Sequence, residues 1–227
     1  MDRIALSSYE HSMDILRMKL NEMFSLSLES FDSSIKSLEN VDVKTAEMVI
    51  KRDDEIDALK REIEEIVYEI LLKYKPLSQD LRRIIMAMKI TGELERIADQ
   101  GVNIAQVTQF LEGKTLIKPL IDIPKMAQVA REMLHGAMKA YFDENIELAK
   151  KIWLMDDQVD ELDRRVVNDL EEIVEKHCSR DRIAQAERLI LVSRAIERVA
   201  DHSTNICEET TYMILGKELY TLLGGER

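Results

Sequence analysis

One motif occurs twice in the sequence, about a hundred residues apart. In the first copy Glu95, Asp99 and Asn103 follow one another at steps of four. Their counterparts in the second copy stand 102 positions later and are Glu197, Asp201 and Asn205. On an α-helix a step of four turns by only about 40°, so the three oxygen-bearing side chains of one copy share a face. The repeat therefore predicts two copies of one helical unit.

A second motif repeats in the same order and supports the duplication. Asp53 and Asp57 lie in the run Asp-Asp-Glu-Ile-Asp-Ala-Leu, and 103 positions later Asp156 and Asp160 lie in Asp-Asp-Gln-Val-Asp-Glu-Leu. Each half of the chain thus carries a pair of acids in each of two predicted helices. Both pairs return in register and in order.

The apolar spacing predicts three long helices in each half. Only seven Gly and three Pro interrupt a chain of 227 residues, and the apolar positions recur at threes and fours, which is typical of helices. In the first half we expect helices over 2–39, from the cap residues Asn40 and Asp42 to Tyr74, and over 76–112. In the second half we expect them over 124–142, 145–177 and 180–215.

The predicted fold is all-α, with two tandem three-helix bundles related by a pseudo-two-fold. The boundary between the halves falls in the connector that contains Pro119 and Pro124, which gives domains 1–116 and 117–227. Helices of about 30 residues would be about 45 Å long, so we expect an elongated molecule.

The charge of the chain limits its partners. The formal net charge is −12 and the pI is about 4.9, which disfavours binding to a nucleic-acid backbone and suits cations or a partner with a basic face. No apolar run approaches the roughly 18 residues of a membrane span, and no signal-peptide core is visible at the start. We expect a soluble, cytoplasmic protein with Cys178 and Cys207 as free thiols.

The paired acids predict one cation site in each half. On a helical wheel Glu95 and Asp99 continue the apolar stripe of their helix, while Asp53 and Asp57 lie on the shoulder of theirs. Four carboxylates gathered at one helix–helix seam repel one another unless protons, basic side chains or cations neutralise them. Oxygen-only ligands suit Mg²⁺, Ca²⁺, Mn²⁺ or iron and argue against structural zinc.

Two simpler readings compete with a metal site. Acid pairs at i, i+4 arise readily among 44 acidic residues, and Arg96 and Arg198 offer a salt-bridge network at the same seam. His202 follows Asp201 but points about 100° away from it on the helix. The double recurrence of both acid pairs favours the metal site.

These motifs resemble those of the PhoU family of phosphate-signalling regulators. The resemblance rests on D-D-x-[IV]-D-x-L in each middle helix and E-R-[IV]-A-D-x-x-x-N in each last helix, and it covers nearly the whole chain. It implies multinuclear iron or another metal at two sites, with Asn103 and Asn205 as outer participants. The acids of the first site would be Asp53, Asp57, Glu95 and Asp99, and those of the second Asp156, Asp160, Glu197 and Asp201.

The resemblance also implies a function without catalysis. Members of the family are negative regulators of the phosphate-starvation response, and they link the ATPase subunit of the phosphate ABC transporter to a membrane sensor histidine kinase. They are cytoplasmic, meet the membrane only through these partners and commonly form homodimers. The alternative function is a di-iron oxidase or iron store, but such bundles usually need two Glu-x-x-His motifs, and only Glu132 and His135 have that spacing.

Overall fold

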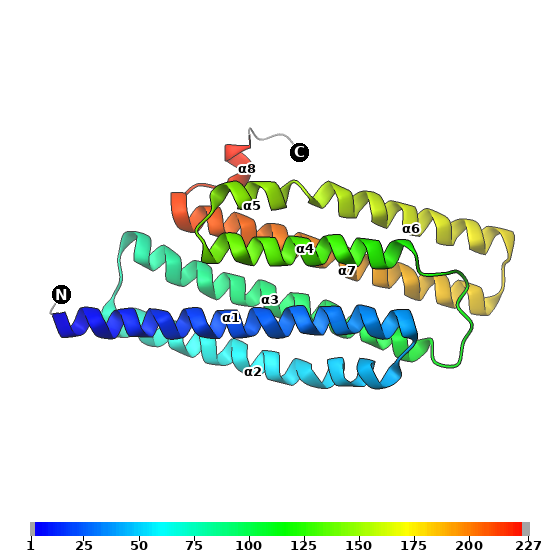
Figure 1. Ribbon diagram of the computed structural model, residues 1–227, viewed down its shortest axis with the longest axis horizontal. Coiled ribbons are helices and arrows are strands. Elements are labelled where there is room, and N and C mark those ends of the chain that lie inside the picture. Colours follow the sequence, from blue (N-terminus) through cyan, green and yellow to red (C-terminus); the bar gives the residue numbers. More distant parts are fainter. Residues whose placement is uncertain (1–2, 224–227) are drawn as a thin grey trace.

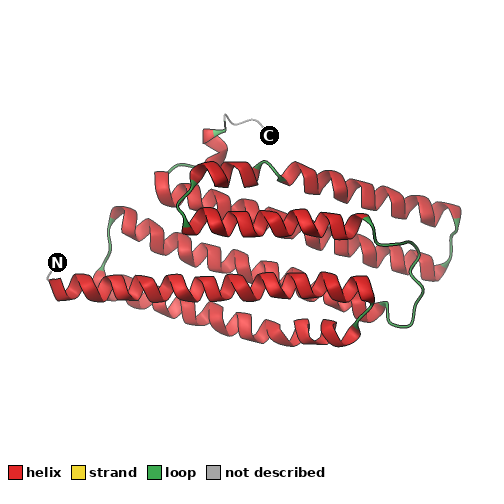
Figure 2. Ribbon diagram, viewed as in Figure 1, coloured by secondary structure: helices red, strands yellow, loops and turns green. Residues whose placement is uncertain are grey.

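The computed structural model describes residues 3–223. Every regular element in this part of the chain is an α-helix (Figure 2), which confirms the predicted all-α class. The long helices run nearly along the long axis of an elongated body (Figure 1). No helix within residues 3–223 combines the length and the apolarity that a membrane span requires.

The first bundle consists of α1 (Arg3–Asn40), α2 (Val43–Tyr74) and α3 (Ser78–Phe110). Asp42 begins α2 as predicted, because its carboxylate accepts hydrogen bonds from the backbone N–H groups of the first turn, at 3.1 and 3.2 Å. Lys75 closes the same helix in the left-handed conformation. Short connections therefore reverse the chain at both ends of α2, so α1, α2 and α3 form an up-down-up bundle.

The second bundle differs from the prediction in its middle helix. It contains α4 (Asp122–Phe142), α5 (Ile146–Trp153), α6 (Asp156–Lys176) and α7 (Arg180–Leu215), followed by the short α8 (Leu219–Leu222). The expected continuous helix over 145–177 is wrong, because the chain leaves the α-helix after Trp153 and resumes it at Asp156.

The middle helix is interrupted next to two buried side chains. Ile152 and Trp153 are adjacent in sequence, yet both are buried, and Trp153 donates a hydrogen bond to Glu208 of α7 at 3.1 Å. The backbone N–H of Met155 bonds to the carbonyl of Ile152, a tightened turn that shifts the phase of the helix. Opposite it on α4 stands Gly136, where a Cβ would come within 2.3 Å of the Ile152 side chain. The tightened turn thus lies where Ile152 and Trp153 are both buried and where Ile152 comes close to α4.

The two bundles meet along the helices that carry the first repeated motif. α3 and α7 pack against each other in the middle of the molecule, with α1 and α2 on one side and α4, α5 and α6 on the other (Figure 1). One hydrophobic core runs through both halves. Because α3 and α7 are equivalent helices of the repeat, this pairing is the one that a pseudo-two-fold between the halves produces.

Candidate metal centres

The first acidic cluster lies between α2 and α3. Asp53 and Asp57 come from α2, Glu95 and Asp99 come from α3, and the two helices pack together. Oδ1 of Asp53 is buried and has no hydrogen-bond partner within residues 3–223. Burial, and then repulsion from Asp99, Asp57 and Glu95, raises the pKa of Asp53 to about 6. The four predicted acids are thus close enough to affect one another strongly.

Among the described residues, one lysine forms an ion pair with this group of carboxylates. Lys60 Nζ lies 3.1 Å from Glu95 Oε1. The pKa of Asp99 is still raised, first by burial and then by Glu95 and Asp57, although Lys60 and His202 act in the lowering direction. One ammonium group cannot neutralise four carboxylates, so the cluster keeps an excess of negative charge.

The second acidic cluster lies between α6 and α7. The pKa of Glu197 is raised, first by burial and then by the charge of Asp201. Asp163 and Asp160 raise it further, whereas Arg194 lowers it. Asp156 begins α6 and is buried, 6% exposed. Of the predicted acids of the second half, Asp160, Glu197 and Asp201 therefore lie close together at one helix–helix seam, and Asp156 is buried at the start of the same α6.

Asp163 belongs to this second cluster but was not predicted. Its side chain is buried, accepts a hydrogen bond from Ser193 Oγ at 2.8 Å and pairs with Arg194 at 2.8 Å. With the repeat offset of 103, Asp163 is the counterpart of Lys60 in the first half. A comparison of the two halves beyond Asp160 would have found it, as an acid where the first half has a base.

The carboxylates fit a hard cation by their chemistry, but they do not yet surround one. Across residues 3–223, no three His, Cys, Asp or Glu side chains are arranged around a common point as a bound metal ion requires. The donors on offer are carboxylate oxygens, which suit hard cations, and the buried Oδ1 of Asp53 lacks a partner that a cation would supply. Binding would require side chains of the cluster to change rotamer.

The two motif asparagines lie at the contact between α3 and α7, but only Asn205 bonds across it. Asn205 Nδ2 donates to Glu93 Oε2 at 3.0 Å, and Asn103 Nδ2 donates to Gln100 Oε1 at 3.2 Å. Arg96 pairs with Glu93 at 3.0 Å instead of with a motif acid. Arg198 forms no ion pair with an acid within residues 3–223, so the alternative in which the two motif arginines pair with the motif acids is not the arrangement seen there.

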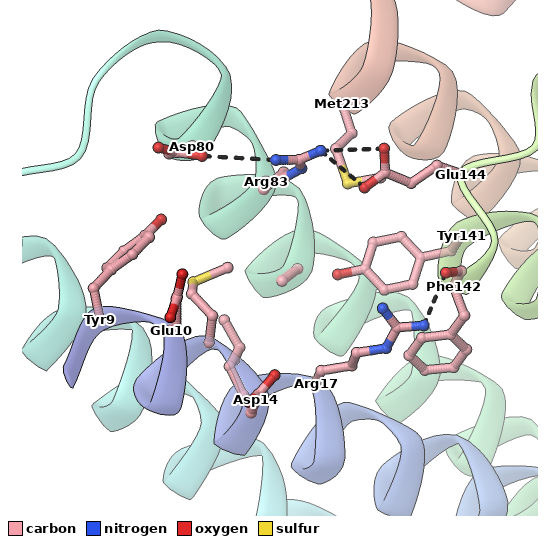
Figure 3. A pocket seen from close by; sticks show the side chains of 13 residues that line it. Tyr9, Glu10, Asp14, Arg17, Asp80, Arg83, Tyr141, Phe142, Glu144 and Met213 are labelled. Carbon is pink, nitrogen blue, oxygen red and sulfur yellow. Dashed lines mark hydrogen bonds and ion pairs between the residues drawn. The ribbon is translucent and has the colours of Figure 1, made fainter. Parts of the chain in front are cut away.

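A separate cavity of about 390 Å³ lies where α1, α3 and α4 meet, and it contains none of the predicted ligands (Figure 3). Both arginines in its lining already have partners. Arg83 pairs with Glu144 at 3.0 Å and with Asp80 at 3.7 Å, and Arg17 donates to the carbonyl of Phe142 at 2.9 Å. These contacts tie the first bundle to the end of α4.

Two tandem helical bundles, each with an acidic cluster between its last two long helices, define a class of duplicated all-α protein. The family model described as the PhoU domain matches this chain twice, over residues 20–108 and 123–210. The chain belongs to the PhoU family, as its motifs indicated. Each match falls within one of the two bundles.

Relatives and solved structures agree with this membership. The phosphate-specific transport system accessory protein PhoU homolog 1 of Thermotoga maritima is 37% identical over 221 residues, which cover 96% of this chain and 93% of that protein. The PhoU homolog of Clostridium acetobutylicum is 31% identical over 93% of this chain and 96% of its own length. The crystal structure of PhoU from Pseudomonas aeruginosa has a TM-score of 0.87 at 25% identity, covering 92% of this chain and all of that one.

Proposed function

We propose that this protein is a regulatory accessory protein of a phosphate-specific transport system and that it is not an enzyme. Family membership over nearly the whole chain supports the proposal, since the relatives in Thermotoga maritima and Clostridium acetobutylicum carry that description. Its role is negative regulation of phosphate uptake and of the phosphate-starvation response. The family match is the one observation that carries this conclusion.

The proposed partners are the ATPase subunit of the phosphate ABC transporter and a sensor histidine kinase. A long body with a net charge of −12 offers an acidic surface to basic faces of such partners. The protein would act in the cytoplasm as a homodimer and reach the membrane only through these partners.

The two acidic clusters are the proposed metal centres. Asp53, Asp57, Glu95 and Asp99 would hold metal in the first half, and Asp156, Asp160, Glu197 and Asp201 in the second, with multinuclear iron as the first choice and Mg²⁺, Mn²⁺ or Ca²⁺ as alternatives. The partnerless Oδ1 of Asp53 and the raised pKa values of Asp53, Asp99 and Glu197 support the assignment. Bound cations would supply positive charge where the chain supplies too little.

Metal content tests these centres. Protein purified from its own cells should contain metal by elemental analysis, and Asp99→Ala and Asp201→Ala should each remove about half of it, because each lies in one of the two clusters. Asp54→Ala is a matched control, since Asp54 is exposed and adjacent to a motif acid. Circular dichroism should show unchanged helicity in all three variants. Full metal content in both cluster variants would contradict the assignment.

Expression tests the regulatory role independently of metal. Deletion of the gene should switch on phosphatase and transporter expression in phosphate-rich medium, and the wild-type gene should restore repression. A pull-down from the same cells should recover the transporter ATPase and the sensor kinase. Unchanged expression in the deletion strain would refute the regulatory proposal, whatever the metal content.

The alternative, an iron oxidase or iron store, gains no support from the only Glu-x-x-His pair. Glu132 and His135 are both exposed on α4. Glu132 accepts a hydrogen bond from Gln128, and the ring of His135 lies 6.2 Å from that of Phe24. Oxygen consumption on addition of ferrous iron separates the alternatives, and we expect none above the autoxidation rate of the same ferrous iron in protein-free buffer.

A further inference from the structure

The contact between α3 and α7 has two sides that the repeat makes equivalent. On one side, Glu93 of α3 reaches across to α7, where its Oε2 accepts from His202 Nδ1 at 2.8 Å and from Asn205 Nδ2 at 3.0 Å. Its Oε1 accepts from Arg96 of its own helix at 3.0 Å. The Glu93 side chain is only 13% exposed. A carboxylate, held by three donors, therefore fills this side of the contact.

On the other side the carboxylate is missing while its surroundings are kept. The offset of 102 places Ala195 where the first half has Glu93. The same offset makes Gln100, Asn103 and Arg198 the counterparts of His202, Asn205 and Arg96. Ala195 and these three polar residues all line one cavity of about 270 Å³ between α3 and α7. The cavity is thus the space that a second Glu93 carboxylate would occupy.

The rest of the cavity wall is basic, amidic or apolar. The remaining lining residues are Gln106, Val107, Phe110, Arg188 and Leu191. None of the lining residues is acidic, although the chain has 44 acidic residues. A neighbouring ion pair is also missing on this side. Lys89 and Glu209 form a salt bridge at 2.8 Å on the first side, and their repeat counterparts here are the apolar Leu191 and Val107.

The two arginines of the cavity are available to a ligand. Arg188 lies over the ring of Phe110, 5.2 Å from its centroid, and Arg198 is exposed at the rim. Neither forms an ion pair with an acidic residue in the part of the chain that the structure describes. In a chain with a net charge of −12 this is a local concentration of unneutralised positive charge. Two guanidinium groups beside carboxamide donors are well suited to an oxyanion.

We propose that this cavity binds a small oxyanion, either a phosphate or a carboxylate group, at the position equivalent to the Glu93 carboxylate. Arg198 and Asn103 would donate to it as Arg96 and Asn205 donate to Glu93, and Arg188 would supply the second positive charge. The site lies between the two bundles and uses none of the proposed metal-binding carboxylates. A ligand there joins α3 to α7, so it stabilises the packing of the bundles by mass action.

Calorimetric titration of metal-free protein tests the proposal directly. Inorganic phosphate and succinate are titrated separately at constant ionic strength, so that binding of one, the other or both identifies the source of the oxyanion. The double variant Arg188→Gln/Arg198→Gln should weaken binding at least about tenfold, because charge-assisted hydrogen bonds are lost. The control Arg164→Gln/Arg165→Gln changes the net charge equally on the exposed face of α6 and should bind as the wild type does.

A second variant places a carboxylate in the cavity and leaves Arg188 and Arg198 unchanged, so it tests the proposal without removing their positive charges. Ala195→Glu places a carboxylate opposite Gln100, Asn103 and Arg198, as Glu93 stands on the other side. It should abolish binding of the added anion, and its melting temperature should rise to or above that of the anion-bound wild type. The proposal is overturned if neither anion binds at millimolar concentration, or if the double variant or Ala195→Glu binds as well as the wild type.

Discussion

Replacing Asp53 by Asn tests whether the first acidic cluster lacks enough positive charge of its own. Asn keeps the shape of the side chain and removes its negative charge. In the folded protein, burial and the neighbouring carboxylates raise the pKa of Asp53 from 3.8 to about 6. Ionised Asp53 therefore destabilises the metal-free fold, and the substitution should relieve that cost.

The size and the pH range of the effect follow from this shift. Raising the pKa from 3.8 to about 6 corresponds to about 3 kcal/mol of lost stability once the group is ionised in both states. Since the side chain is partly exposed, solvent screening reduces our expectation to about 1 kcal/mol. The folded state binds the extra proton between pH 3.8 and about 6, so the cost is absent below this window, grows across it and is complete above it. Asp53→Asn should thus be more stable than the wild type only toward neutral pH.

Urea denaturation of chelator-treated protein, followed by circular dichroism, measures this difference. The gain of the variant should be near zero below pH 3.8 and about 1 kcal/mol near pH 7.5. The control Asp54→Asn makes the same charge change at the exposed neighbouring residue, which contributes least among the named acids to the raised pKa of Asp53. Its gain in unfolding free energy should therefore be smaller. A variant no more stable than wild type at neutral pH would show that the cluster is already neutralised and would remove the physical reason for a cation there.

Three further experiments test other parts of the structure. Gly136→Ala should destabilise the protein by about 1 kcal/mol, because a Cβ 2.3 Å from Ile152 overpacks the contact of α4 with α5 and outweighs the gain in helix propensity. Gly92→Ala should instead stabilise it by about 1 kcal/mol, because an added Cβ there meets nothing within 4 Å. Denaturant unfolding measures both changes. A thiol reagent should label the exposed Cys178 but not Cys207, since burial raises the pKa of the Cys207 thiol, and should label both after unfolding. Lys60→Gln should tighten cation binding by a few-fold in a Mn²⁺ titration, because the ammonium group no longer competes for Glu95, and unchanged affinity would refute this competition.

Most of the fold could be predicted because its signals are local. Apolar periodicity, the cap at Asp42 and the breaker near Tyr74 give the helices and their ends. The last long helix ends at Leu215, where Gly216 adopts a φ of 65° as a left-handed cap. The break in the middle helix of the second half could not be predicted, because Ile152 and Val159 fit a continuous helical spacing. The break lies instead where Ile152 closely approaches Gly136 of α4, a contact between helices that the spacing within one helix does not show.

The composition of the acidic clusters was predicted better than the surroundings of the asparagines. Steps of four keep Glu95 and Asp99 on one seam, but each step drifts by about 40°, so Asn103 is about 80° from Glu95. That rotation brings Asn103 to the contact of α3 with α7. There Asn103 bonds to Gln100 of its own helix, whereas Asn205 bonds across the contact to Glu93 of α3. Only the second bond depends on the packing of the two halves, and no spacing within one helix contains that information.

The duplication preserved the acids but not the basic groups that face them. In the first cluster the base is Lys60, which pairs directly with the motif acid Glu95. In the second cluster its counterpart is Asp163, which takes the ion pair of Arg194. A cation entering the first cluster must compete with the Lys60 ammonium group for Glu95. In the second cluster Arg194 pairs with the additional carboxylate of Asp163. The two proposed metal centres should therefore fill at different cation concentrations, with the second filling first, although their motifs are almost the same.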